Sequence, residues 1–426
     1  MKSKTRIFSE EARLAKNAKI KATRLATMQR RKNQESITVD LKLRNNKLSK
    51  VKLAILNKQF TEAKWLWNAI VAHGGSEGYN PSDDTVVIKN YRGEFETRTF
   101  SALGGAMRQG IVSDVEWAEK ATKEKAAKGY KTGSLKFKRS RRSLPLKAHG
   151  TVFLIKGNYV RLPDVGWVRV DGVHQIKPSH EIASARLVRK ADGFHLHVTL
   201  WRPLEDVAFI PGVETGVDEG VSQAVTLSDG RVFDFPIEKS ERLRRLERKV
   251  KGQQVGSNGW FKTKQMILKE FLKVTRRRDN AANLAVREIL KSENVFMQDE
   301  QLASWKRAPG SGAKMNKNIQ GRVKGKLTRH PRVAVLSRSV ATTSPCQKCS
   351  VKTPHAPSER VFVCGNPDCD YSKDREVHAA ENMIIQYHAG AKLRKDFGEV
   401  KLRPVRRKRK VSVDTSGTEG CAGGGD

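Results

Sequence analysis

Apolar and polar residues alternate in several short stretches of the first half of the chain, which predicts β-strands. Every second position of SITVDLKLR, at residues 36–44, is apolar, and this period of two places one face of a strand on a core. Similar runs occur at TVFLI, YVRLP and GWVRV, while ARLVRKADGFHLHVTLW holds two runs around an Asp-Gly pair that favours a hairpin turn. We therefore expect a small antiparallel β-barrel formed by residues 36–45 and 130–205.

Apolar residues spaced three or four positions apart predict helices between these strands. One helix face carries Phe60, Ala63, Trp67 and Ile70, and the Gly-rich loop GGSEGYNPSDD ends that helix. A second helical pattern follows before the chain returns to short strands. Residues 46–129 are thus expected to form a helical insertion in the barrel.

From about residue 212 the pattern changes to strand, hairpin, long helices and strand. VETGVDEG has the pattern of a strand, and AVTLSDGRVFDF predicts a hairpin turned at its Asp-Gly pair. Helical spacing then extends through two basic segments, and the apolar run in VFMQDE, the helical NIQGRVKGKL and the strand VAVL follow. This order of elements predicts an α/β domain made of residues 210–340 and 374–395.

The strongly basic composition indicates the kind of partner. Of 426 residues, 83 are Lys or Arg and 45 are Asp or Glu, giving a formal net charge of +38. Such a surface repels itself unless a polyanion neutralises it, so we expect a nucleic acid partner. A merely cationic, ribosomal-type protein is the weaker alternative. Residues 1–35 are expected to be a flexible or RNA-ordered basic arm, and residues 396–426 a basic and then disordered tail.

Membrane association is not expected from this sequence. No apolar run approaches the roughly 20 residues that cross a bilayer. The N-terminal segment MKSKTRIFSEEARLAKNAKI also lacks the apolar centre of a signal peptide. We therefore expect a cytoplasmic or nucleoid-associated protein.

One basic segment, GSLKFKRSRRSLPLK, combines closely spaced cations with an aromatic residue. Such spacing suits contacts with a phosphate backbone, because each contact neutralises one phosphate and releases counterions. A solvated loop is the alternative. The candidate nucleic-acid contacts are Lys136, Lys138, Arg139, Arg141 and Arg142.

The cysteines give the most specific local signal. Cys346 and Cys349 form one close pair, and Cys364 and Cys369 form a second, wider pair. Two such pairs on converging turns supply four thiolates for a tetrahedral Zn²⁺ ion, and a closed shell of this kind is structural. We expect a zinc ribbon over residues 341–373, while the fifth cysteine lies in the Gly-rich tail.

Several carboxylates lie where predicted elements end or begin. Asp218 follows a short strand, Glu300 follows the VFMQDE strand, and Asp374 and Glu376 open the helical segment DREVHAAENMII. Cleavage of a phosphodiester with two Mg²⁺ ions requires carboxylates close together in space, with no need for proximity in sequence. The order of acids, strands and helices makes these residues candidate magnesium ligands.

At these residues the sequence resembles the TnpB (OrfB) proteins of insertion sequences, which are related to the miniature type V CRISPR effectors. The resemblance spans about 36–390. GVDEGVSQAVTLSDG resembles the first motif of the family's RuvC-like nuclease domain, with Asp218 at the catalytic position. TTSPCQKC and the next cysteine pair resemble its zinc ribbon, and DREVHAAENM resembles its third motif, DRDxNAAxN. KFKRSRRS and GWVRV resemble its wedge region.

The chain departs from the family pattern at two motifs. Gln298 stands where relatives have a catalytic Glu after the second-motif strand. Because side chains alternate along a strand, Glu300 is expected to point to the same side as Gln298 and to replace the missing carboxylate, while Asp299 faces away. In the third motif Glu376 stands at the position of the catalytic Asp and His378 at that of its Asn partner. We rank Glu376 and Asp374 almost equally as the third carboxylate.

The resemblance implies a multidomain fold with a RuvC-like (RNase H-like) core, an inserted zinc ribbon, and a wedge-type β-barrel carrying a helical recognition insertion. It implies a prokaryotic, transposon-associated and RNA-guided DNA endonuclease. Its partners would be a guide RNA and double-stranded target DNA with a short adjacent motif, and its metals two catalytic Mg²⁺ ions and a structural Zn²⁺. A guided repressor with an impaired nuclease site, a transposase and a generic zinc-ribbon protein are the alternatives.

Overall fold

The computed structural model describes residues 10–394 except 91, 128, 130, 205–207, 306–317 and 357. The predicted tail at 396–426 lies outside the described residues. The chain forms two compact units, and each is described by itself below. The first comprises Met1–Val207 and Ile237–Arg277, and the second comprises Ala208–Pro236 and Arg278–Asp426.

A seven-stranded antiparallel sheet forms the centre of the first unit, in the order β4-β8-β9-β1-β7-β6-β5. The order runs from edge strand β4 to edge strand β5, so the described strands form a half-barrel where the sequence predicted a small antiparallel barrel. The strands are β1 (Gln34–Leu43), β4 (Ser143–Leu146), β5 (Leu154–Lys156), β6 (Tyr159–Leu162), β7 (Gly166–Asp171), β8 (Glu181–Lys190) and β9 (Gly193–Pro203).

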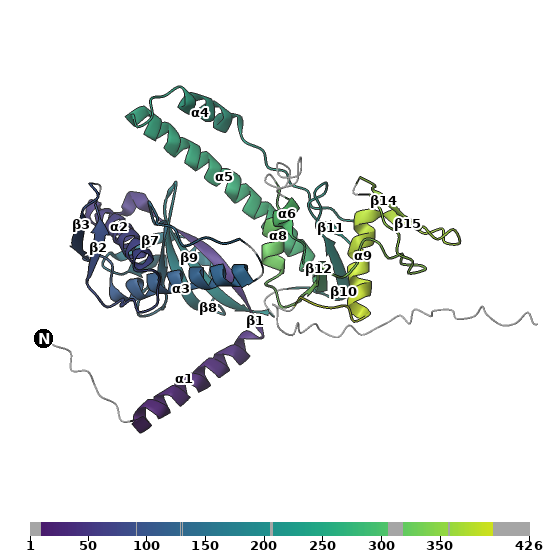
Figure 1. Ribbon diagram of the computed structural model, residues 1–426, viewed down its shortest axis with the longest axis horizontal. Coiled ribbons are helices and arrows are strands. Elements are labelled where there is room, and N and C mark those ends of the chain that lie inside the picture. Colours follow the sequence, from purple (N-terminus) through teal and green to yellow (C-terminus); the bar gives the residue numbers. More distant parts are fainter. Residues whose placement is uncertain are drawn as a thin grey trace, which may run out of the picture. The chain divides into compact units, whose positions relative to one another are not determined.

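Helices and a hairpin complete the first unit (Figure 1). The described part of the predicted N-terminal arm forms the largely exposed helix α1. The other elements are the α2 and α3 helices, the unpredicted hairpin β2-β3, and α4. Their bounds are α1 (Glu10–Arg31), η1 (Asn45–Lys47), α2 (Lys50–Ala72), β2 (Thr85–Lys89), β3 (Phe95–Thr99), α3 (Gly105–Ala127), η2 (Val173–Gln175) and α4 (Glu241–Lys251).

The second unit is built on a four-stranded sheet with the order β11-β10-β12-β13. Strands β10, β12 and β13 are parallel, and β11 runs antiparallel at one edge. The long helix α5 (Asn258–Ile289) enters this unit at Arg278. The remaining bounds are β10 (Ile210–Asp218), β11 (Thr226–Leu227), β12 (Ser292–Gln298), α6 (Leu302–Trp305), α8 (Gln320–Leu327), β13 (Val333–Leu336), β14 (Val361–Val363), β15 (Ser372–Asp374) and α9 (Arg375–His388).

Alternation along the central strand separates two hydrophobic layers. Val295 and Met297 of β12 join one buried cluster together with residues of α5 and α8. Phe296, which points to the opposite face, joins another cluster with Met383 of α9. All seven residues of β12 are buried, as expected for a parallel strand covered on both faces.

A glycine lets helix α9 approach strand β10 closely (Figure 1). A Cβ atom on Gly216 would lie 1.7 Å from the backbone oxygen of Ala380 in α9. No side chain fits in this space, so the glycine determines how near the helix lies to the strand. Because Val217 joins the cluster on the other face, Gly216 and Asp218 both face α9.

Among the helices in the described part of the chain, none is both long enough and apolar enough to span a bilayer.

Candidate active site and metal centre

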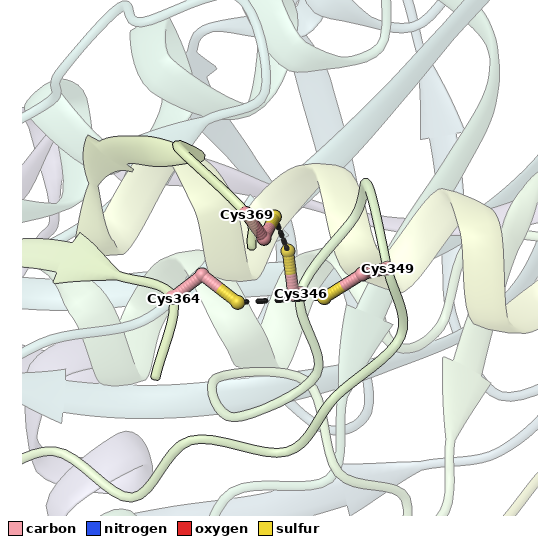
Figure 2. Close-up of side chains that lie close together, drawn as sticks. All are labelled: Cys346, Cys349, Cys364 and Cys369. Atoms are coloured by element: carbon pink, nitrogen blue, oxygen red, sulfur yellow. Dashed lines mark hydrogen bonds between the residues drawn. The ribbon is translucent and has the colours of Figure 1, made fainter. Parts of the chain in front are cut away.

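Four cysteines converge in the second unit, and Figure 2 shows their sulfur atoms pointing toward one another. The ligand atoms of Cys346, Cys349, Cys364 and Cys369 all lie within 4.8 Å of one another. The Sγ atoms are 3.8 Å apart for Cys346 and Cys369 and 3.4 Å apart for Cys349 and Cys364. These separations exceed the about 2.05 Å of a disulfide.

The cysteine arrangement fits a structural zinc ion. Zn–S bonds of about 2.3 Å in tetrahedral geometry separate the sulfurs by about 3.8 Å, close to the distances found. The backbone N–H of Lys348 donates to Cys346 Sγ, and that of Asn366 donates to Cys364 Sγ. Such donors stabilise thiolate charge. The predicted cysteine cluster is therefore confirmed as a group compatible with zinc.

Removing zinc should loosen the ribbon but leave the main sheet folded. We expect treatment with a strong chelator to abolish hydrogen-exchange protection in β14 and β15, because the metal no longer holds the two cysteine pairs together. Strand β12 should keep its protection, since both of its faces are buried. Exchange mass spectrometry checks this result, and unchanged protection of β14 after verified zinc loss would contradict the structural role.

Asp218 lies at the last position of β10, at the edge where the parallel strands end. Its side chain is partly buried and faces α9. Burial is the main reason that the pKa of Asp218 rises to about 8. Three nearby carboxylates raise this pKa further, namely Glu376, Glu300 and Glu219. The structure therefore brings Asp218 into electrostatic contact with two of the other sequence candidates.

The two candidates at the start of α9 have different surroundings. Asp374 is exposed and caps the helix, because its carboxylate accepts hydrogen bonds from the backbone N–H groups of Glu376 and Val377, each at 3.0 Å. Glu376 is buried and accepts hydrogen bonds from Thr226 at 3.2 Å and Arg360 at 2.8 Å. Its pKa is raised, chiefly by burial. Geometry therefore favours Glu376 as the third carboxylate.

Gln298 has a structural role that explains why an amide stands here. Its Nε2 atom donates to the backbone oxygen of Val340 at 2.5 Å, and its Oε1 atom accepts from the Thr342 hydroxyl at 3.0 Å. Two more carbonyls, of Ser337 and Arg338, lie 3.4 Å from the same nitrogen. A carboxylate could not donate to these carbonyls, so Gln298 ties the end of β12 to the loop after β13.

Glu300 lies beyond the end of the strand, so strand alternation does not set its direction. Strand β12 ends at Gln298, and the backbone N–H of Glu300 bonds back to the Gln298 oxygen at 2.9 Å. Burial raises the pKa of Glu300, while the charges of Lys324 and Arg338 lower it. The neighbouring Asp299 accepts a hydrogen bond from Arg394 at 2.8 Å.

Two charged residues near the carboxylates, one buried and one partly buried, did not stand out in the sequence. Glu219 is 4% exposed, and burial raises its pKa to about 7. Lys324 of α8 forms an ion pair with Glu219, with 3.3 Å between Nζ and Oε2. Their only sequence signal is that each charged residue interrupts an apolar pattern, at the end of a strand and in a helix.

The carboxylates suit magnesium by their chemistry. They provide hard oxygen ligands, which Mg²⁺ prefers, and their mutual repulsion around Asp218 would be relieved by a divalent cation. Among the described residues, the cysteines are the only group of three or more potential ligands within 4.8 Å of one another. The carboxylates are spaced more widely than the cysteines, and this is compatible with a site for two ions. When two ions lie about 3.5–4 Å apart, carboxylates that bind different ions are farther from each other than ligands of a single ion.

The basic segment before β4 divides into exposed and internal residues. Arg141 is buried and pairs with Asp114 at 2.7 Å. The Lys138 nitrogen lies 3.1 Å from the centre of the Trp67 ring, and burial lowers the pKa of Lys138 to about 8. The predicted nucleic-acid contacts Lys136, Arg139 and Arg142 are exposed.

His378, which departs from the family's Asn, connects α9 with the ribbon. Its ring stacks on Phe362 with 3.9 Å between the ring centres. Asn382 and Tyr371 lie within hydrogen-bond distance of its two nitrogens, at 3.0 and 3.1 Å. Burial lowers its pKa to about 4, so the ring is neutral at physiological pH.

Comparison with known proteins gives distant structural likenesses. No protein-family model and no curated protein matches the chain. One similar structure is titled "Cryo-EM structure of the Cas12f1-sgRNA-target DNA complex". It has 13% identity and a TM-score of 0.40, and the alignment covers 82% of this chain and 99% of that one. Another, "Cryo-EM structure of CRISPR-Cas12f Ternary Complex", has 14% identity, a TM-score of 0.25, and coverage of 78% and 81%. Likeness at this level does not assign a function.

Proposed function

We propose that this protein is an RNA-guided DNA endonuclease whose site is formed by Asp218, Glu300 and Glu376. The observation that carries the proposal is the meeting of the end of β10 with the start of α9: Asp218 pairs with Thr226 in the sheet, and the Thr226 hydroxyl donates to Glu376 at 3.2 Å. Glu376 and Glu300 both act to raise the pKa of Asp218 further than burial alone. The resemblance of the sequence motifs to TnpB proteins gives the reaction and the association with a transposable element.

Two of the three acids have distinct supports in the second unit. Asp218 is held at the strand end by close packing of β10 against α9. Glu376 is fixed by Thr226 and by the ribbon residue Arg360. When bound, Mg²⁺ would activate a water molecule and stabilise the leaving oxygen of a phosphodiester. The acids of the chain would hold these ions and keep them close to the DNA backbone.

The remaining parts of the proposal concern partners and domains. The net charge of +38 suits binding of a guide RNA together with target DNA. In such systems base pairing recognises the sequence, while the protein contacts backbone shape and a short DNA motif. We assign the half-barrel to the wedge, the α2-α3 insertion to the recognition domain, and the four-stranded sheet with α9 to the RuvC-like domain.

One experiment tests the proposed function directly. The protein is expressed with its native flanking DNA, the RNA that copurifies is sequenced, and the complex is incubated with Mg²⁺ and a plasmid library matching that RNA. A discrete RNA with cuts beside one fixed motif is the expected result. Uncut plasmid in the presence of Mg²⁺ would exclude the nuclease.

A guided DNA-binding protein that does not cut is the second candidate. The observation favouring it is the use of Gln298 in loop contacts, which leaves no carboxylate at that motif position. In the same experiment this function would give a discrete RNA and DNA that is bound at a fixed motif but remains intact. A transposase would instead give joined DNA ends.

The substitution Glu300→Ala tests whether Glu300 replaces the absent carboxylate. We expect cleavage to fall at least about a hundredfold, as for the loss of one strong electrostatic contact in an active site, while the copurified RNA stays bound. Asp299→Asn is the matched control, because it removes one negative charge from the adjacent residue, whose side chain contacts Arg394. Normal cutting by Glu300→Ala would refute the assignment. An equal loss of cleavage in both variants would mean that cleavage depends on the total negative charge of this segment and not on Glu300 as a ligand.

A further inference from the structure

Lys324 lies at the C-terminal ends of the two central strands of the second unit, β10 and β12. It comes from α8, and its side chain is only 13% exposed. The Nζ atom donates to the backbone oxygens of Gln298 at 3.3 Å and Glu300 at 2.8 Å. Both carbonyls lie at or beyond the end of β12, where regular sheet pairing stops and carbonyls need other donors.

The same ammonium group contacts the end of β10. Its nitrogen is 3.3 Å from Oε2 of Glu219, which directly follows Asp218, and 3.9 Å from Asp299. The ammonium group therefore donates to two carbonyls at the end of β12 and forms an ion pair with Glu219. One side chain thus joins the ends of both strands that carry candidate ligands.

We propose that Lys324 is a positioning residue, which fixes the backbone of Glu300 relative to Asp218 so that their carboxylates can share divalent ions. This inference rests on the proposed nuclease site. Lys324 acts through the two strand ends and not on DNA, because its largely buried side chain donates to two backbone carbonyls and pairs with Glu219. Small displacements matter here, since ligand positions need to hold within about 0.5 Å.

A simpler role would be neutralisation of the buried Glu219. An unpaired buried carboxylate is strongly destabilising, whereas replacing both partners of a buried pair with apolar residues is often tolerated. The double substitution Glu219→Leu with Lys324→Met therefore separates the two roles. It leaves no unpaired buried carboxylate at position 219, but the carbonyls of Gln298 and Glu300 lose their donor.

The test measures binding of Mn²⁺, as a spectroscopic substitute for Mg²⁺, to the full-length zinc-loaded protein by electron paramagnetic resonance. We expect Lys324→Met to raise the half-saturating Mn²⁺ concentration at least tenfold. The double variant should regain the wild-type melting temperature but not the Mn²⁺ affinity. Lys326→Met is the matched control, since Lys326 is exposed on the same helix, and its affinity should not change.

The outcomes separate the positioning role from the proposed function. Wild-type affinity in Lys324→Met, or restored affinity in the double variant, would overturn the role of Lys324 alone. If wild-type protein binds Mn²⁺ no better than Asp218→Asn does, the proposed nuclease site fails, and the positioning role fails with it.

Discussion

Replacing Asp218 by Asn should abolish Mg²⁺-dependent DNA cleavage while the complex with RNA still forms. We expect cleavage to fall by at least about three orders of magnitude, because Asp218 is the acid near which Glu376 and Glu300 converge. The folded protein should melt no earlier than wild type when divalent ions are absent. The reason is that Asp218 has a pKa of about 8 in the folded protein but ionises at lower pH in the unfolded chain. This difference favours the unfolded chain and so lowers the stability of the wild type.

The sign of this stability effect follows from proton binding. Between the ordinary pKa of 3.8 and the raised value of about 8, the folded state holds a proton that the unfolded state has released. Stability is therefore lost as pH rises through this window, and an amide at position 218 removes the loss. Melting curves at pH 5 and pH 8 should differ less for Asp218→Asn than for wild type.

Asp229→Asn is the matched control for Asp218→Asn. It removes one negative charge from the hairpin after β10, and Asn-Gly preserves the turn chemistry of Asp229-Gly230. Asp229 contacts Arg231 and not the acids of the site. Cleavage should be near the wild-type rate in this variant. Cleavage by Asp218→Asn at more than a tenth of the wild-type rate would remove Asp218 from the catalytic site.

Local sequence patterns were sufficient for most of the elements near the site. VAVL forms β13, and the apolar spacing of DREVHAAENMII forms α9. The apolar run before Gln298 predicted a strand, as is typical of strands with both faces buried. The structure shows such a strand, β12. In each case the residues that define the element are neighbours in sequence, so their pattern is visible without knowledge of the fold.

Features that depend on distant partners could not be predicted in this way. Gln298 was recognised as a departure, but its bonds to Val340 and Thr342 involve a loop after the next strand. The contacts between Lys324 and the two strand ends also join residues that are far apart in the sequence. Sequence also left Asp374 and Glu376 nearly equal, because only geometry shows that Asp374 is used as a helix cap.

The features of the first unit that the sequence did not predict have related physical causes. The sequence predicted the strands of the barrel but not its extent, because whether the edge strands β4 and β5 meet depends on twist and register over the whole sheet. The hairpin of β2 and β3 was missed, although both strands alternate in burial. Each strand is only 5 residues long, and such a short run is a weak periodic signal.

Gly216→Ala should strongly destabilise the second unit. The added Cβ would lie 1.7 Å from the Ala380 oxygen and 2.6 Å from its carbonyl carbon, both backbone atoms of α9. Backbone cannot move aside as a flexible side chain does, so α9 must shift away from β10. We expect a destabilisation of about 3 kcal/mol or more, measured by chemical unfolding with a probe in α9.

The same shift should separate Glu376 from Asp218 and so impair cleavage even where the protein remains folded. Gly325→Ala is the matched control, because no atom lies within 4 Å of its added Cβ and the residue belongs to helix α8. Alanine there should stabilise the helix by about 0.5–1 kcal/mol. If Gly216→Ala retained both wild-type stability and wild-type cleavage, close packing of α9 on β10 could not be what brings Glu376 to Asp218.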